Sequence, residues 1–397
     1  MNSFEFLILK KIYFIYNIMF FDKSKFDKKI FEKELNDLAK QIREEECDDD
    51  MTHLNQIINW TNIFGLIGLF TCWYSISIIP IICISTYTFA KWVIIGHHTC
   101  HGGYDKVGKG TKYNRFTYGL KWRRFIDWFD WFLPEAWNIE HNNRHHYHLG
   151  EVLDPDLVED NMEYVRNSKI PIFIKYLIVL VLMLTWKYTY YASNTYKELC
   201  IHKYERQTGI HVIKERKVSM IYTSLIISKY WYSFIDFFFN IIGPYFVFRF
   251  VLLPLVFYYI NPQYGINTLF NLVFAEMMTN FHSFVMISTN HCGSDICRFM
   301  TPCDLSDKGE FYLRQIAGSV NYTNGSEIID YIHGYLNYQI EHHLFPDLTV
   351  KSYRKMAPKV QEICKKYGVI YIKENVLIRL KKTLDIFVGN TSMKKIN

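Results

Sequence analysis

The sequence has 397 residues, of which 50% are hydrophobic and 18% aromatic, yet its mean hydropathy is only -0.05. Such values arise when very apolar stretches alternate with strongly charged ones, which predicts a membrane domain with cytosolic caps. The net charge of +6 is small and spread along the chain, so nucleic-acid binding has no support. The nine cysteines lack CxxC spacing in their tightest cluster, which argues against a secreted disulfide framework.

The N-terminal segment, 1–54, is predicted to be cytosolic or interfacial. Residues 1–21 are apolar but include two lysines and no cleavage-like site, so a signal peptide is not expected. Residues 22–50 are mostly charged or polar with sparse apolar positions, as in a solvated amphipathic helix.

A long uncharged stretch follows, because residues 51–90 contain no Asp, Glu, Lys or Arg. Its length suffices for two membrane spans of about 20 residues each. We therefore predict a helical hairpin, 57–77 and 79–97, whose second helix delivers a first group of histidines to the membrane surface. Beyond it, 125–137 (FIDWFDWFLPEAW) predicts a helix that lies in the membrane interface.

Three further apolar stretches lie at 170–186, 235–260 and 266–290. If the histidine clusters on either side share one site, an even number of spans must separate them, so one stretch does not cross. We choose 170–186 because it is the shortest. The turns that would then be lumenal, near 78 and at 261–265, contain no Lys or Arg, in accord with the positive-inside rule.

The predicted fold is an all-α integral membrane protein. It has about four transmembrane helices in two hairpins, interfacial helices, and a cytosolic helical cap that holds a di-metal site. The membrane domain is expected to cover 55–370, with a cytosolic tail at 371–397 and both termini in the cytosol.

Nine of the 15 histidines fall in three short windows, which read HHTCH at 97–101, HNNRHHYH at 141–148 and QIEHH at 339–343. Residues four apart share one face of a helix, so His97 with His101, and His141 with His145, can point at one centre. Adjacent histidines in the second and third windows can turn to a second metal. Neutral imidazole suits iron, zinc and copper, and so many rings exceed the ligands of a lone zinc, which predicts two metal ions.

This pattern of HxxxH, HxxxHH and QxxHH after a helical hairpin resembles the membrane fatty acid desaturase family. The segment GYLNYQIEHHLFP at 334–346 is similar to the third histidine box of its front-end branch, and Asp154-Pro155-Asp156 and Asn290-His291 also match. The resemblance implies two iron ions that use O₂ to desaturate a lipid acyl chain. It implies the following iron ligands, with Gln339 as a further candidate: His97, His101, His141, His145, His146, His291, His342 and His343.

Four neighbouring side chains are expected to orient these ligands through hydrogen bonds rather than to bind metal. They are His98, His148, Asp154 and Asp156. Residues that bind the substrate are left unassigned by the sequence.

Electron supply is a further inference from the resemblance. Many front-end members carry a fused cytochrome b5 domain with a His-Pro-Gly-Gly motif, and this sequence has no His-Pro pair. A separate donor is therefore expected, such as cytochrome b5 with its reductase, docked on basic residues near the first two boxes, namely Lys121, Arg123, Arg124 and Arg144. The final residues, Lys394-Lys395-Ile396-Asn397, resemble a dilysine retrieval signal of the endoplasmic reticulum.

Other functions fit the histidine pattern less well. A sphingolipid desaturase or a lipid hydroxylase would use the same scaffold, and the boxes do not distinguish these outcomes. A metal transporter should place its ligands near the middle of the membrane, whereas these windows adjoin charged loops. A zinc hydrolase of the HExxH type is not supported, because that motif is absent.

Overall fold

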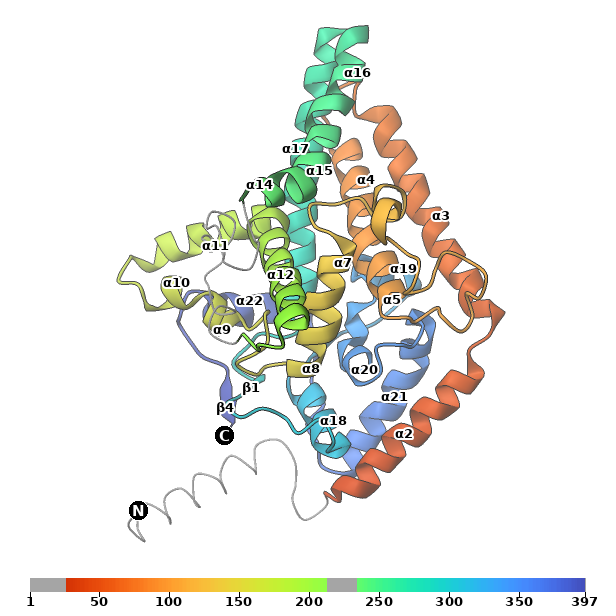
Figure 1. Ribbon diagram of the computed structural model, residues 1–397, viewed down its shortest axis with the longest axis vertical. Coiled ribbons are helices and arrows are strands. Elements are labelled where there is room, and N and C mark those ends of the chain that lie inside the picture. The colour runs from red at the N-terminus through yellow and green to blue at the C-terminus, as the bar shows by residue number, and fades with distance from the viewer. Residues whose placement is uncertain (1–25, 213–233, 397) are drawn as a thin grey trace.

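The computed structural model describes residues 26–212 and 234–396, so the predictions for residues 1–21 lie outside the described residues. The described part is mostly helical (Figure 1). Its strands form two short parallel pairs, in which β1 (Cys297–Phe299) pairs with β4 (Lys394–Ile396), and β2 (Asn321–Tyr322) with β3 (Lys373–Glu374). The prediction of a helical protein is confirmed.

The first hairpin consists of α3 (Asp48–Thr71) and a continuous helical run of α4 (Ile78–Phe89), the π-helix η1 (Ala90–Gly96) and α5 (His97–Cys100). Three aspartates in the first turn of α3 favour its start, since they face the positive end of the helix dipole. Glycines let the two helices approach closely, because a Cβ at Gly68 would lie 2.5 Å from the Ile84 side chain. Compared with the helix predicted at 57–77, α3 starts nine residues earlier, at Asp48, and ends at Thr71.

The second hairpin is helical from Phe234 to Ile260 and continues in α17 (Pro262–Ser288). The first arm comprises α14 (Phe234–Phe237), η6 (Phe238–Ile242), α15 (Gly243–Phe246), η7 (Val247–Leu252) and α16 (Leu253–Ile260). Asn261 caps α17 by accepting a hydrogen bond from the Gln263 backbone at 2.9 Å. Asn271 of α17 donates to the Cys72 and Ser75 carbonyls at 2.7 and 2.8 Å, which ties the two hairpins together.

The stretch predicted to be short, 170–186, belongs to a much longer helix. α11 (Ile172–Trp186) continues through the π-helix η4 (Lys187–Tyr191) into α12 (Ala192–Thr208), a run of 37 residues. The prediction that this stretch forms a short helix is wrong. Shortness therefore gives no ground for placing the helix in the membrane interface. Among the described residues, three helical runs are long and apolar enough to cross a membrane, at 78–100, 172–208 and 235–260.

The interfacial helix predicted at 125–137 is also wrong. This segment instead contains α6 (Arg124–Asp127), an irregular turn, and α7 (Pro134–Trp137), preceded by η2 (Lys121–Arg123). Proline starts α7, and the buried Asp127 accepts hydrogen bonds from Arg123 and from the Gly119 backbone, which stabilises the turn in place of a regular helix. As a result Trp128, Trp131 and Trp137 are core residues rather than interface anchors.

A helical cap covers the end of the bundle away from the α16–α17 turn (Figure 1). Phe31, Leu35 and Ile42 of α2 (Lys28–Glu45) are buried in one apolar cluster with Tyr353 and Val360 of α21 (Val350–Lys366). This amphipathic packing fits the pattern predicted for 22–50. The cap also contains α18 (Lys308–Ala317), α19 (Glu327–Ile332), η8 (Leu336–Tyr338), α20 (Gln339–Leu344) and α22 (Val376–Phe387).

Candidate metal centre

The three histidine windows come from separate elements that meet at one place. The first lies at the end of the 78–100 helix, and the third forms most of α20. The second lies on a helical run of α7, the π-helix η3 (Asn138–His145) and α8 (His146–His148), after which α9 (Val158–Asn161) and α10 (Glu163–Asn167) lead to α11. His291 follows α17 directly and reaches the same place.

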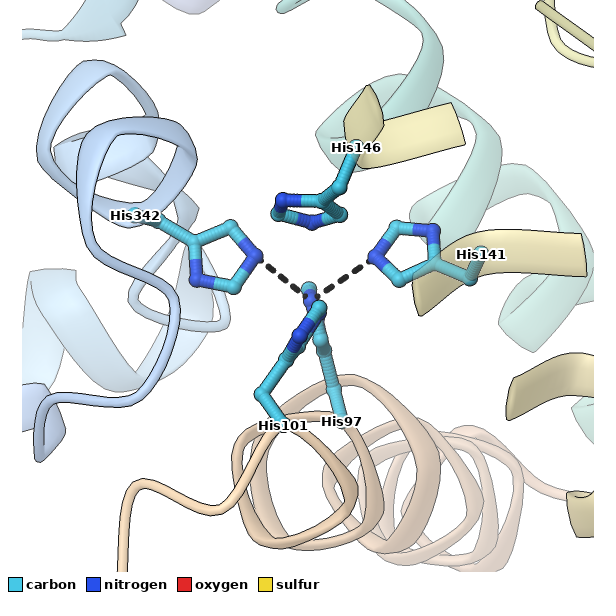
Figure 2. Close-up of side chains that lie close together, drawn as sticks. All are labelled: His97, His101, His141, His146 and His342. Atoms are coloured by element: carbon cyan, nitrogen blue, oxygen red, sulfur yellow. Dashed lines mark hydrogen bonds between the residues drawn. The ribbon is translucent and has the colours of Figure 1, made fainter. Parts of the chain in front are cut away.

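One group contains five histidines, each of which offers one ring nitrogen that lies within 4.8 Å of those of the other four: His97, His101, His141, His146 and His342 (Figure 2). The Nε2 atom of His97 lies 2.9 Å from Nε2 of His342 and 3.2 Å from Nε2 of His141. Two nitrogen ligands that sit at right angles about 2.1 Å from one ion are about 3.0 Å apart, so this spacing fits shared coordination.

Unpaired nitrogens provide a second test of the fit. In the described part of the chain, buried Nε2 of His101 and both ring nitrogens of His146 have no hydrogen-bond partner. Buried polar atoms are normally paired, and an orphaned one is costly. A metal ion bound among these rings would satisfy them, so the residues fit such a group.

A second group, His145, His291 and His343, lies beside the first, again with ring nitrogens within 4.8 Å. The Nε2 atoms of His343 and His291 are 3.1 Å apart. The Gln339 amide nitrogen lies 2.9 Å from Nε2 of His291, and its buried Oε1 has no partner among the described residues. The structure thus brings Gln339 to the edge of the second group, where its role as a ligand stays a prediction.

Burial keeps these imidazoles neutral, the form that binds metal. Removal from water disfavours the charged ring, and the neighbouring histidines add repulsion, so the pKa values of His141, His146 and His343 lie well below the ordinary value. Burial likewise lowers the pKa of His291 to about 3. His145 differs, because the Asp154 carboxylate outweighs the effect of burial and raises its pKa.

The Asp154 carboxylate orients His145. Its Oδ1 lies 2.9 Å from Nδ1 of His145, and its Oδ2 accepts a hydrogen bond from the Gly150 backbone. Asp156, 4.0 Å from His145, accepts hydrogen bonds from the hydroxyls of Tyr190 and Tyr191. Such a carboxylate fixes the imidazole tautomer and leaves Nε2 free for a metal.

The other two predicted orienting residues lie outside both groups. His98 pairs through Nδ1 with the Ile94 carbonyl at 2.9 Å, and His148 with Glu151 at 3.0 Å. In the described part of the chain, no hydrogen bond joins either ring to a histidine of the two groups. The His98 ring instead packs on two rings of the five-histidine group, with its centroid 4.8 Å from that of His97 and 5.5 Å from that of His342. The predicted orienting role of both residues stays a prediction.

Sequence reasoning missed three orienting groups from distant parts of the cap. Nδ1 of His342 lies 3.2 Å from the Tyr353 hydroxyl, and Nδ1 of His343 lies 3.0 Å from the Gln315 amide oxygen. The Gly318 carbonyl holds Nδ1 of His291 at 3.1 Å. No local motif marks these positions.

Two spaces open onto the centre from different sides. A vestibule of mixed lining, called the polar vestibule for its charged rim, reaches His101, His146 and His343. Its polar residues include Arg115, Asn138, Asn142 and Lys308, and its apolar ones include Phe116, Phe311, Tyr312 and Pro346. A narrow apolar cavity reaches His291 and Asp156, and its lining includes Trp186, Tyr190, Tyr191, Phe284, Ile287 and Phe387. The apolar cavity has a volume of about 40 Å³, which is room for water-sized groups only.

The predicted docking arginines are mostly occupied by internal contacts. Arg123 pairs with the buried Asp127, and Arg124 is itself buried and donates to the Asn240 carbonyl at 2.7 Å. Arg144 pairs with Glu205 at 2.9 Å. Arg124 is thus buried and Arg123 is partly occupied, whereas Lys121 is exposed. Docking of an electron donor on these charges stays a prediction.

The fold and the centre together define a helical protein with a buried histidine cluster that fits a metal ion and with helices long and apolar enough to cross a membrane. A family model described as fatty acid desaturase matches residues 57–375. The chain belongs to the fatty acid desaturase family.

Similarity to individual relatives is confined to shorter segments. Fatty acid desaturase 3 of Bos taurus is 35% identical over 111 residues, which cover 28% of this chain and 23% of that protein. Delta(5) fatty acid desaturase A of Dictyostelium discoideum is 28% identical over 106 residues, which cover 25% of this chain and 23% of that protein. The NADPH-dependent stearoyl-CoA 9-desaturase of Mycobacterium tuberculosis is 38% identical over 76 residues, which cover 19% of this chain and 18% of that protein. The matched segments thus span about a fifth of these relatives, and no solved structure matches the chain.

Proposed function

We propose that this protein is a fatty acyl desaturase that inserts a double bond into a lipid acyl chain at a histidine-ligated di-iron centre. The observation that carries the proposal is the convergence of eight buried or half-buried histidines into two adjacent groups within a chain of this family. The five-histidine group would hold one ion, and His145, His291 and His343 the other, with Gln339 at its edge.

Iron bound there would supply O₂ activation and oxidation of an unactivated C–H bond. The reaction converts a –CH₂–CH₂– pair, O₂, two electrons and two protons into –CH=CH– and two waters. Asp154, Tyr353 and Gln315 keep the ligand rings in place. We propose a separate electron donor, such as cytochrome b5 with its reductase, which would approach through the polar vestibule.

The proposed branch is the front-end type, as the QIEHH third box indicates. The test is expression in yeast with a panel of fatty acids and mass-spectrometric mapping of new double bonds. A new double bond between the carboxyl group and an existing one supports the proposal. A hydroxylated product, or no new product from a stably inserted protein, would contradict it.

For the topology, we propose four membrane spans, formed by the two hairpins, with the 172–208 helix not crossing. Both ends of that helix contact segments beside the metal centre: Lys175 donates to the Arg166 carbonyl at 2.8 Å, and Glu205 pairs with Arg144. A crossing helix would have its ends on opposite sides of the membrane. The histidine boxes and both termini would then lie in the cytosol, and the resemblance of Lys394-Lys395 to a retrieval signal favours the endoplasmic reticulum.

Engineered glycosylation acceptors test this topology. An acceptor in the turn at 261–265 should be modified, because that turn would lie in the lumen, whereas one at 163–168 should not. Gel mobility with and without glycosidase gives the measurement. Modification at 163–168 would place the second histidine box on the wrong side of the membrane.

A further inference from the structure

The short helix α20 contributes histidines to both groups of the centre. His342 belongs to the five-histidine group and His343 to the second group, and Gln339 lies at the edge of the second. The helix has only six residues. Isolated helices shorter than about 12 residues are not stable in water, so α20 is held mainly by its contacts with neighbouring elements. Those contacts therefore determine how both groups receive their imidazoles from the third histidine window.

The start of α20 is capped by a residue from another part of the chain. Tyr338, at its own N-cap position, makes no side-chain hydrogen bond to the first turn. Instead, the side-chain oxygen of Asn321 in β2 accepts a hydrogen bond from the Ile340 backbone N–H at 2.8 Å. The first N–H groups of a helix have no partner within it, so this distant amide takes the place of a local cap.

The same asparagine also holds the side chain that precedes the two histidines. Nδ2 of Asn321 donates to Oε2 of Glu341 at 2.8 Å, and the Tyr371 hydroxyl donates to Oε1 at 2.9 Å. Asn321 further donates to the Tyr371 hydroxyl at 2.5 Å, which closes the network. Glu341 and Asn321 are buried, and a buried polar network whose members are all paired is rigid.

The parallel pair of β2 and β3 keeps the two hydrogen-bond donors side by side. Asn321 stands opposite Lys373 in the register, and its backbone N–H donates to the Ile372 carbonyl at 3.0 Å. Tyr371 is the residue just before Ile372. The strand pair thus fixes the position of Asn321, and Asn321 in turn contacts α20 through both backbone and side chain.

We infer that Asn321 is a positioning residue for both metal groups, because it fixes the helix that presents His342 to one and His343 to the other. The inference rests on the proposed di-iron function and adds to it a residue that acts on both ions together. Gln315 and Tyr353 differ from it, since each bonds a single ring.

The experiment titrates ferrous iron into the purified full-length protein in competition with a chelator, which gives the affinity of each site. Loss of a residue that orients ligands typically weakens metal binding by about tenfold to a hundredfold, and we expect Asn321→Ala to weaken both sites by such a factor. Gln315→Ala should weaken only the site that contains His343. Asn324→Ala is the matched control, because this exposed asparagine of the same segment bonds only the Lys373 side chain, and it should leave both affinities unchanged. Unchanged affinities in Asn321→Ala, or weakening of one site alone, would overturn the inference.

A rescue experiment distinguishes positioning from a general loss of structure. Asn321→Asp keeps an oxygen for the Ile340 N–H but replaces the donor that faces Glu341 with a second oxygen, so both sites should weaken. Combining it with Glu341→Gln restores the hydrogen bond with donor and acceptor exchanged, and this double variant should recover most of the lost affinity. Unfolding temperatures are compared in parallel. A double variant that folds but binds iron as weakly as Asn321→Asp would overturn the inference.

These affinities are measured without turnover, which separates the inference from the proposed reaction. If the wild type binds two iron ions but forms no double bond, the reaction fails, and the affinities of the Asn321 variants still decide the inference. If the wild type forms a double bond and Asn321→Ala binds iron normally at both sites, only the inference fails. A wild type that binds no iron would overturn both.

Discussion

Replacing His342 with alanine should lower desaturated product by more than about a hundredfold, because its ring belongs to the five-histidine group and contacts His97 at 2.9 Å. His145→Ala should have the same effect through the second group. Each variant should still insert into the membrane, since the helices that carry the hairpins are unchanged. The measurement is product formation in yeast, normalised to protein in the membrane fraction.

The control for these variants is His211→Ala, because His211 is 88% exposed at its side chain and lies outside both groups. It should retain wild-type activity. Full activity of His342→Ala would show that this ring is not an essential ligand. Loss of membrane insertion in the variants would instead assign the histidines a structural role.

Arg379→Ala is expected to have the largest effect on stability. The substitution removes the cation that pairs with Asp295 and leaves the Cys292 and Thr289 carbonyls without that donor. The Asp295 side chain is 25% exposed and keeps a 2.8 Å pair with Lys382, so the main loss is that of the hydrogen bonds to the buried carbonyls. An orphaned buried acceptor typically costs about 1–3 kcal/mol of unfolding free energy. Because the same side chain anchors the residue after His291, we also expect iron to be lost from the second group.

The matched control on the same helix is Lys381→Ala, which breaks an exposed i,i+4 pair with Asp385. Such surface pairs contribute little, so this variant should unfold at nearly the wild-type temperature. Thermal unfolding in detergent and metal analysis give the two measurements. Equal stability of the two variants would show that the Arg379 contacts do not support the fold.

The clustering of the histidines was predictable because its signals are local, while their role as ligands stays a prediction. His97 and His101 are four residues apart and do belong to one group. His141 and His145 have the same spacing but fall in the two different groups, because they lie on the π-helix η3, whose wider turn does not keep the α-helical register. The orienting residues were not predictable, because Gln315 lies 28 residues from His343 and Tyr353 lies 11 residues from His342. Their hydrogen bonds depend on how α18 and α21 pack against α20, which no local pattern records.

Hydropathy located the apolar stretches, but it did not predict how far their helices extend or which charged residues pair inside the protein. The helix that contains 170–186 continues to Thr208 because Lys187, which ends the apolar stretch, is fully buried and pairs with Asp130 at 2.6 Å. In the same way, alternating Trp and Asp at 125–137 suggested an amphipathic helix. The aspartates form internal pairs there, which turns the tryptophans into the core.

In the C-terminal tail predicted at 371–397, too, composition does not reveal which residues become buried. Its composition is mixed and lysine-rich, which suggests a solvated end. In the structure α22 buries Arg379, Thr383, Ile386 and Phe387, and β4 pairs with β1 next to the metal centre. A buried arginine with hydrogen-bond acceptors on four residues, Thr289, Cys292, Asp295 and Glu374, cannot be recognised without the three-dimensional contacts that satisfy it.

The most direct test of the di-iron proposal is metal analysis of the purified full-length protein, combined with Mössbauer spectroscopy and turnover with cytochrome b5 and its reductase. The account predicts two iron ions per chain, a spectrum of two neighbouring histidine-ligated irons, and desaturation that is lost on chelation and restored by iron. His342→Ala should retain less iron and no activity. A protein that contains stoichiometric zinc, with activity that does not depend on iron, would contradict it.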